Sequence, residues 1–175
     1  IMLIGKMLAY TGMKQGKEVS WLPSYGPEMR GGTANCTVVI SERPVGSPVI
    51  QSPRAVVAMN LPSLDKFEPM LKPGGLLLIN SSLIDVKSGR DDITEVLVPA
   101  NDMAIKVGNP KVANMVMLAV YVALTDIVTF KTLEKMLDEK LAKKQSLLEL
   151  NHKAFAEGRQ HMQQYQGVAA AGEGD

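Results

Sequence analysis

Short apolar runs in the first two thirds of the chain have the length of buried strands. Residues 54–59, 76–79 and 95–98 are predicted as strands, and residues 76–79 form a continuous apolar run. Continuous apolar runs of this length are typical of parallel strands that are covered on both faces. Helices are expected after these runs, over residues 62–72, 102–107 and 111–124.

Strands that alternate with helices predict an α/β domain. We therefore expect a three-layer, doubly wound, Rossmann-like sheet that is mainly parallel, with helices on both faces. Residues 18–22 and 34–41 are predicted as two earlier strands, the second with Cys36, Val38 and Ile40 on one face. Since no helix separates these two strands, their pairing is expected to be antiparallel.

Both ends of the chain are predicted to be helical. Residues 1–14 form an amphipathic pattern, and because no capping residue precedes Ile1, we expect that residues are missing before it. Leu133, Met136 and Leu137 form an apolar stripe among mixed charges, which indicates a helical C-terminal segment. A single α/β domain is expected over residues 1–157, followed by a mobile tail over residues 158–175.

Composition excludes several classes of chemistry. The 175 residues include 19 Lys and Arg against 18 Asp and Glu, so a net charge of +1 gives no electrostatic case for nucleic acid. With one cysteine, Cys36, and two histidines, a thiolate zinc site or an iron–sulfur cluster is not expected. The longest apolar run, residues 115–124, is too short to span a membrane, and a cytoplasmic protein is the expectation.

Polar segments follow the predicted strands, at the edge where an open parallel sheet binds ligands. They are residues 23–32, Asn60, residues 80–82 and residues 99–101. Asn80 and Ser81 are either ligand-facing or part of an ordinary polar turn. Asn101 is either a site residue or the cap of the following helix.

Residues 23–32, here called the 23–32 loop, carry the most informative side chains. Arg30 offers a permanently charged fork that suits carboxylate or phosphate, and Gly31 and Gly32 allow backbone amides to approach a ligand. Tyr25 offers a flat amphipathic surface. The alternative is a surface loop in which Glu28 pairs with Arg30. The candidate binding or partner-facing residues are Ser24, Tyr25, Gly26, Glu28, Arg30, Gly31, Gly32, Asn80, Ser81 and Asn101.

The motif over residues 19–36, with the sequence VSWLPSYGPEMRGGTANC, closely resembles the gamma subunit of 2-oxoacid:ferredoxin (acceptor) oxidoreductases. The resemblance covers nearly all of residues 1–157. Further matching segments are SP at 47–48, MN at 59–60, SLDKF at 63–67, LKPGG at 71–75, NSS at 80–82, VPAN at 98–101, GN at 108–109 and VANM at 112–115. The pattern is most similar to the 2-oxoglutarate and branched-chain (2-ketoisovalerate) types.

The resemblance implies a hetero-oligomeric enzyme that converts a 2-oxoacid and coenzyme A (CoA) to acyl-CoA and carbon dioxide, with ferredoxin or another acceptor taking the electrons. It implies thiamine diphosphate, Mg²⁺ and iron–sulfur clusters on partner chains, namely alpha and beta subunits and, where present, a ferredoxin-like delta subunit. Family members carry a strand and glycine-rich turn before the segment that Ile1 begins. The sequence lacks the Gly-Asp-Gly pattern followed by Asn that family catalytic subunits use for thiamine diphosphate and magnesium.

Within such a complex this chain is expected to be accessory and inactive alone, with no catalytic or metal-binding residue of its own. It would complete the assembly and line the CoA approach, with Arg30 near a CoA phosphate and with Tyr25 or Asn101 near the active-site mouth. Two alternatives remain: a stand-alone nucleotide- or CoA-binding module, and a purely structural subunit whose 23–32 loop only packs against a partner.

Overall fold

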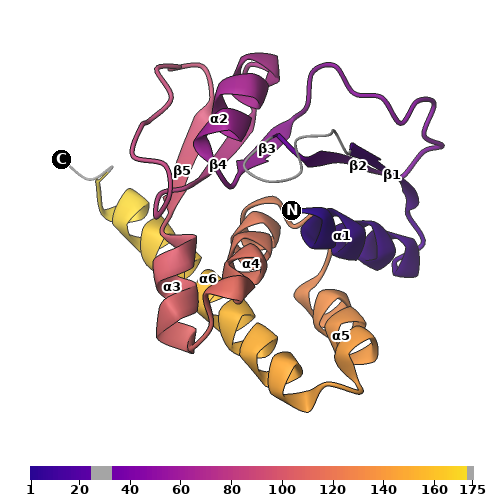
Figure 1. The fold of residues 1–175 in the computed structure, drawn as a ribbon. Helices are drawn as coiled ribbons and strands as arrows, with labels where there is room; N and C mark the ends of the chain where they lie inside the picture. The colour runs from indigo at the N-terminus through magenta and orange to yellow at the C-terminus, as the bar shows by residue number, and fades with distance from the viewer. Residues whose placement is uncertain (25–32, 173–175) are drawn as a thin grey trace.

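A computed structural model describes the backbone of residues 1–24 and 33–172, with side chains as far as residue 163. Helices and strands alternate in the middle of the chain and helices alone follow (Figure 1). The elements are α1 (Met2–Lys14), β1 (Glu18–Ser24), β2 (Asn35–Ser41), β3 (Ala55–Ala58), α2 (Leu61–Phe67), η1 (Glu68–Met70), β4 (Leu76–Asn80), β5 (Thr94–Val98), α3 (Ala100–Val107), η2 (Pro110–Val112), α4 (Ala113–Thr125), α5 (Phe130–Leu141) and α6 (Gln145–Gly172).

The central sheet is parallel, with strand order β3-β4-β5, and helices cover both of its faces (Figure 1). Successive side chains of a strand point to opposite faces, so Leu77 and Ile79 of β4 pack with Leu64 of α2. Leu78, between them, belongs to the second core cluster, which includes Met115 of α4. Burial on both faces explains the unbroken apolar run of β4, and the predicted α/β class with its parallel sheet is confirmed.

The first two strands form an antiparallel sheet of their own, as expected from the lack of a helix between them. Helix α1 packs on the face that carries Cys36, Val38 and Ile40. The approach is close, because a Cβ added at Gly5 would overlap Cys36 Sγ. Burial raises the pKa of the half-buried Cys36 thiol, which keeps it protonated and unreactive near neutral pH.

Helix α4 is apolar nearly all round because it lies in the centre of the molecule, where α6 crosses it. Gly158 allows the crossing, since a Cβ there would lie 2.7 Å from the Val116 carbonyl oxygen. The boundary expected after residue 157 therefore falls inside α6, and Met162 is still buried in the core. Most of residues 158–163 are polar, and few of them, such as Met162, pack against the core. The apolar pattern was therefore too short to predict that the helix continues.

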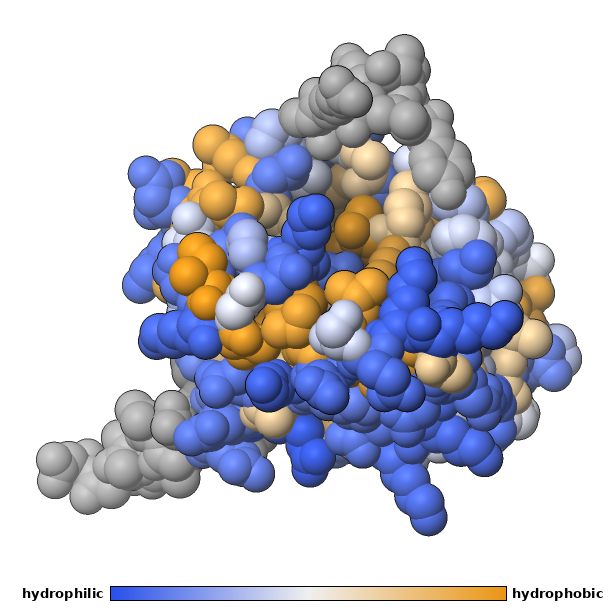
Figure 2. Space-filling model, turned by 60° about the horizontal axis from the view of Figure 1, so that its bottom comes forward, coloured by the Kyte–Doolittle hydropathy of each residue, from blue (hydrophilic) through white to orange (hydrophobic). Residues whose placement is uncertain are grey.

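Helix α5 buries Leu133, Met136 and Leu137, as the apolar stripe predicted, and exposes its charged face. The side of the molecule that comes forward in Figure 2 is accordingly mostly hydrophilic, with apolar side chains in a central band. Among the helices described, none is long and apolar enough to cross a membrane.

Candidate functional site

The carboxyl ends of β3, β4 and β5 meet at one edge of the parallel sheet, here called the carboxyl edge. Three of the four predicted polar segments lie there. Asn60 follows β3, Asn80 ends β4, and Asn101 lies in the first turn of α3, which begins directly after β5. The structure thus brings together side chains that are about 20 residues apart in sequence.

An amide pair forms the buried part of the carboxyl edge. Asn80 has no exposed surface, and its Nδ2 donates a hydrogen bond to Asn101 Oδ1 at 2.8 Å. The same nitrogen lies 3.5 Å from the Met59 carbonyl oxygen, at the long end of the hydrogen-bond range. Asn80 Oδ1 is also buried, and no described residue donates to it. The Asn80 side chain is therefore inside the protein, while its backbone carbonyl accepts from the Leu83 N–H at 3.1 Å and begins the predicted polar turn.

The interpretation of Asn101 as a helix cap is wrong. Helix α3 begins at Ala100, so Pro99 occupies the N-cap and makes no side-chain cap bond. The helix starts two residues earlier than the sequence predicts, which places Asn101 inside the first turn. Its side chain is half-buried and accepts from Asn80 instead.

A second pair at the carboxyl edge, Ser82 with Asp102, was not among the predicted site residues. Ser82 Oγ donates to Asp102 Oδ2 at 3.0 Å and accepts from the Asp102 backbone N–H at 3.1 Å. The neighbouring Ser81 is tied by its backbone N–H to the Val98 carbonyl at 2.9 Å. The sequence signal for this pair was an acidic residue, Asp102, in the first turn of a helix. A carboxylate there is equally explained by its favourable interaction with the helix dipole, so it did not indicate a site.

Asn60 has a structural role in addition to its place at the edge. Its Oδ1 accepts from the Ser63 backbone N–H at 3.1 Å and caps α2. This explains why an asparagine stands shortly before Pro62 in the first turn of a helix.

The predicted residues of the 23–32 loop from Tyr25 onward lie outside the described residues; they are Tyr25, Gly26, Glu28, Arg30, Gly31 and Gly32. The flanks of the loop are described. Ser24 is exposed at the end of β1, where it pairs with Asn35 of β2. Thr33 Oγ1 accepts from Lys66 Nζ of α2 at 3.1 Å, so the returning chain lies against the helix that Asn60 caps.

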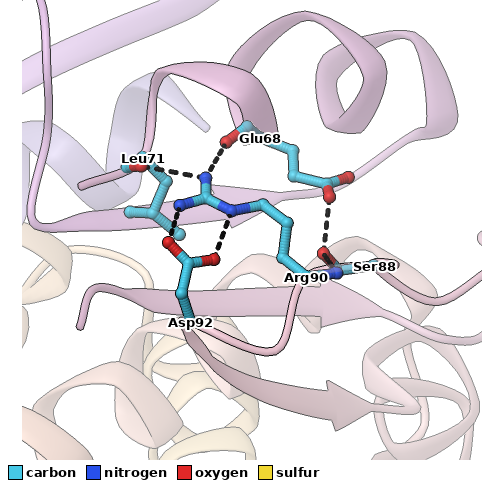
Figure 3. Close-up of polar contacts among 5 residues, drawn as sticks. All are labelled: Glu68, Leu71, Ser88, Arg90 and Asp92. Carbon is cyan, nitrogen blue, oxygen red and sulfur yellow. Dashed lines mark hydrogen bonds and ion pairs between the residues drawn. The ribbon is translucent and has the colours of Figure 1, made fainter. Parts of the chain in front are cut away.

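The opposite edge of the sheet, here called the amino edge, holds a polar cluster centred on Arg90 (Figure 3). Its guanidinium donates two bonds to the Asp92 carboxylate, at 2.8 and 2.7 Å, and lowers the pKa of that carboxyl. Nη1 donates to the carbonyls of Glu68 and Leu71, at 3.0 and 2.9 Å. Ser88 donates to the Glu68 carboxylate and binds the loop before β5 to η1. Arg90 thus joins the loop before β5 to Glu68 and Leu71 before β4, which indicates a structural clamp.

The resemblance places the cofactors on partner chains, and two of them, the metal ion and the iron–sulfur cluster, can be compared with the residues of this chain. In the described part, no three His, Cys, Asp or Glu side chains gather in a way that could hold a metal ion. Cys36, the one cysteine of the sequence, could supply only one of the several thiolates that an iron–sulfur cluster needs.

Comparisons with known proteins agree with the resemblance. Residues 1–161 match the family model described as pyruvate ferredoxin/flavodoxin oxidoreductase. The chain is 42% identical over 124 residues to ketoisovalerate oxidoreductase subunit VorA of Methanothermobacter thermautotrophicus, covering 71% of this chain and 26% of that relative. It is 33% identical to 2-oxoglutarate synthase subunit KorC of Methanocaldococcus jannaschii, covering 90% of this chain and 85% of the relative.

Among solved structures, the gamma subunit of a keto/oxoacid ferredoxin oxidoreductase from Geobacter sulfurreducens has the same fold. It shares 32% sequence identity and a TM-score of 0.76, covering 91% of this chain and 89% of that one. The chain therefore spans about a quarter of VorA but most of KorC and of the gamma subunit.

Proposed function

The chain belongs to the pyruvate ferredoxin/flavodoxin oxidoreductase family, and from this premise we propose that it is the gamma subunit of a 2-oxoacid:ferredoxin oxidoreductase. The names of its relatives support this proposal, since they are subunits of ketoisovalerate and 2-oxoglutarate enzymes. The gamma subunit from Geobacter sulfurreducens matches over nearly its whole length. We propose a branched-chain 2-oxoacid or 2-oxoglutarate as the substrate of the complex.

The proposed reaction of the complex is an oxidative decarboxylation. The bond between C1 and C2 of the 2-oxoacid breaks and releases carbon dioxide, and C2 forms a thioester bond with the CoA sulfur. Two electrons pass to two oxidised ferredoxins, and the thiol proton is released. Thiamine diphosphate with Mg²⁺ supplies the decarboxylation chemistry and iron–sulfur clusters carry the electrons, all on partner chains in this proposal.

The proposed partners are the alpha and beta subunits and, where the complex has one, a ferredoxin-like delta subunit. The lengths of the relatives support a permanent association. A segment that stands as a separate chain in KorC forms about a quarter of a longer polypeptide in VorA. In VorA the homologous domain is thus covalently joined to further protein.

Within the complex, the proposed role of this chain is to line the approach of CoA. The observation that carries this role is the convergence of Asn80, Asn101 and the Ser82–Asp102 pair at the carboxyl edge. Polar groups at this edge of a parallel sheet are typical of ligand sites. Arg30 of the 23–32 loop is proposed to bind a CoA phosphate, because a guanidinium matches phosphate in charge and shape.

The two alternatives predict different behaviour. A stand-alone nucleotide- or CoA-binding module would bind its ligand without partners, but relatives named as enzyme subunits do not favour it. A purely structural subunit would need the 23–32 loop for assembly and not for CoA.

The test is co-expression with the genomic neighbours and purification through a tag on this chain. CoA-dependent reduction of a viologen dye is then measured with a panel of 2-oxoacids. A complex that reduces the dye with 2-oxoglutarate or a branched-chain 2-oxoacid supports the proposal and identifies the substrate. A protein that recruits nothing, although the neighbours are expressed, contradicts it.

Arg30→Ala tests the role in CoA binding, with exposed Arg54→Ala as the matched control at the amino edge. Loss of a charge-assisted phosphate contact should raise the apparent KM for CoA about tenfold. An unchanged KM would exclude Arg30 from CoA binding. Loss of assembly would favour the structural alternative.

A further inference from the structure

The orientation of the Asn80 amide is determined by its surroundings. The Met59 carbonyl, 3.5 Å from Asn80 Nδ2, can only accept a hydrogen bond. Exchange of the Asn80 amide nitrogen and oxygen would bring two acceptor oxygens together there and would leave a buried N–H without its partner. The observed orientation is therefore favoured, although it leaves Asn80 Oδ1 buried with no donor among the described residues.

This orientation also determines which way the Asn101 amide faces. Because Asn80 Nδ2 donates to Asn101 Oδ1, the oxygen of Asn101 is turned toward the protein interior. No described residue accepts from the amide nitrogen of Asn101, whose side chain is half-buried. The carboxyl edge thus presents N–H donors at Asn101, and the partner that suits them is an acceptor oxygen.

We propose that Asn80 is a positioning residue that turns the Asn101 amide donors toward an acceptor oxygen of CoA. The inference rests on the proposed function, and it adds that the site offers hydrogen-bond donors to its ligand. Phosphate, amide carbonyl and hydroxyl oxygens of CoA all have this acceptor chemistry. The buried Asn80 Oδ1, to which no described residue donates, is the second observation in its support, because an unpaired buried polar group calls for an explanation and this one lies at the carboxyl edge.

The variant Asn80→Asp tests this polarity without a change in side-chain size. The introduced carboxylate, when ionised, can only accept, so it would draw the Asn101 N–H inward and turn Asn101 Oδ1 outward. In the reconstituted complex, the apparent KM for CoA at pH 8 should rise about tenfold or more while kcat changes less. Burial raises the pKa of a carboxyl, so at pH 5.5 the introduced acid is protonated and donates again. There the KM should return to within about threefold of the wild-type value at the same pH.

Matched variants separate polarity from damage to the fold. Asn151 is another buried asparagine whose Nδ2 donates to a carbonyl, that of Leu147, but it lies in α6 away from the carboxyl edge. Asn151→Asp should leave the KM for CoA unchanged at both pH values. Asn80→Leu cannot orient Asn101, so its KM should be raised at both pH values with no recovery.

Charged groups already present around the carboxyl edge are unchanged in these variants. They are Asp102 of α3, bonded to Ser82, and Asp65 and Lys66 of α2. Comparison of each variant with the wild-type complex at the same pH therefore removes their contribution.

The outcomes distinguish this inference from the proposed function. If the wild-type complex shows no CoA-dependent activity, the proposed function fails, and the inference with it. If the wild-type complex is active and Asn80→Asp behaves like Asn151→Asp, only the inference is wrong. The inference is supported if the KM for CoA recovers at pH 5.5 in Asn80→Asp and in no other variant. Loss of assembly in Asn80→Asp, with normal assembly of Asn151→Asp, would mean that Asn101 contacts a partner chain and would overturn it.

Discussion

The two edges of the parallel sheet differ in how completely their polar groups are paired. At the amino edge, the Arg90 guanidinium makes four hydrogen bonds and both oxygens of Asp92 are used (Figure 3). At the carboxyl edge, no described residue donates to the buried Asn80 Oδ1 or accepts from the Asn101 amide nitrogen. The first edge has the pairing of a structural clamp, whereas the second combines paired groups, such as Ser82 with Asp102, with an unpaired buried oxygen at Asn80 among the described residues.

The difference follows from the topology of the sheet. At the amino edge the chain returns to the sheet, and the turn at residues 71–75 must be held next to the loop before β5. The backbone bond from Gly74 N–H to the Asp92 carbonyl, at 2.6 Å, joins these two segments directly. At the carboxyl edge, each strand runs into a helix start or a turn, which leaves polar side chains and N–H groups together. Four predictions test the contrast, in order of decreasing effect.

The largest effect is expected for Gly75→Ala in the tightly packed amino edge. A Cβ at this position would lie 2.7 Å from the Lys72 carbonyl oxygen and 2.8 Å from Leu71 Cδ1. Because a backbone atom cannot easily move away, the free energy of unfolding should fall by about 3 kcal/mol in urea denaturation. Gly74→Ala is the control, since its Cβ would meet nothing within 4 Å. Its φ of +72° should cost only about 1 kcal/mol. Equal losses would show that the packing is not tight.

Removal of the clamp itself is expected to have the next largest effect. Arg90→Ala leaves the Leu71 and Glu68 carbonyls without their donor and frees Asp92. The Tm from a thermal scan should fall by roughly 5 °C or more. Exposed Arg54→Ala, at the same edge, should change the Tm by less than about 2 °C. Similar values for both variants would mean that Arg90 does not stabilise the edge.

The carboxyl edge should respond differently when its buried polar group is removed. Asn80→Leu deletes an unsatisfied oxygen together with two hydrogen bonds, one of them long. These effects oppose each other, so the free energy of unfolding should change by less than about 1 kcal/mol in urea denaturation. A loss above about 2 kcal/mol would show that Asn80 stabilises the fold in the way that Arg90 does, and the contrast between the edges would disappear.

The smallest effect is expected for the Tm at acidic pH. Arg90 lowers the pKa of Asp92, so the folded state binds the Asp92 proton more weakly than the unfolded state, in which the pKa is about 4. The stabilisation is complete above that value and is lost as pH falls through the lower, folded pKa. The Tm of the wild-type chain should therefore fall more steeply below about pH 4 than that of Asp92→Asn. Parallel curves over this range would contradict the role of the ion pair; its exposure keeps the effect small.

Much of the fold follows from local patterns in the sequence. The apolar runs that became β3, β4 and β5 have the pattern of strands inside a parallel sheet, which is clearest in β4, covered on both faces. The direction of the strands then places residues 80–82 and 99–101 at one edge. The family followed from the long motif at residues 19–36, and the comparisons confirm it.

Other features depended on contacts that no local pattern contains. Asn101 in isolation has the properties of a cap, and only the start of α3 at Ala100 and the position of Asn80 decide otherwise. The same holds for α6, where one glycine between polar residues permits the crossing with α4.

The sequence by itself determined the alternation of strands and helices, the antiparallel first pair, the family and the edge at which a site should lie. The tertiary structure alone decided which polar groups at that edge are paired and which way the Asn101 amide faces. The physical reason is that hydrophobic periodicity is a property of neighbouring residues, whereas a hydrogen bond between Asn80 and Asn101 depends on β4 and β5 lying side by side, which brings residues 21 apart within 2.8 Å.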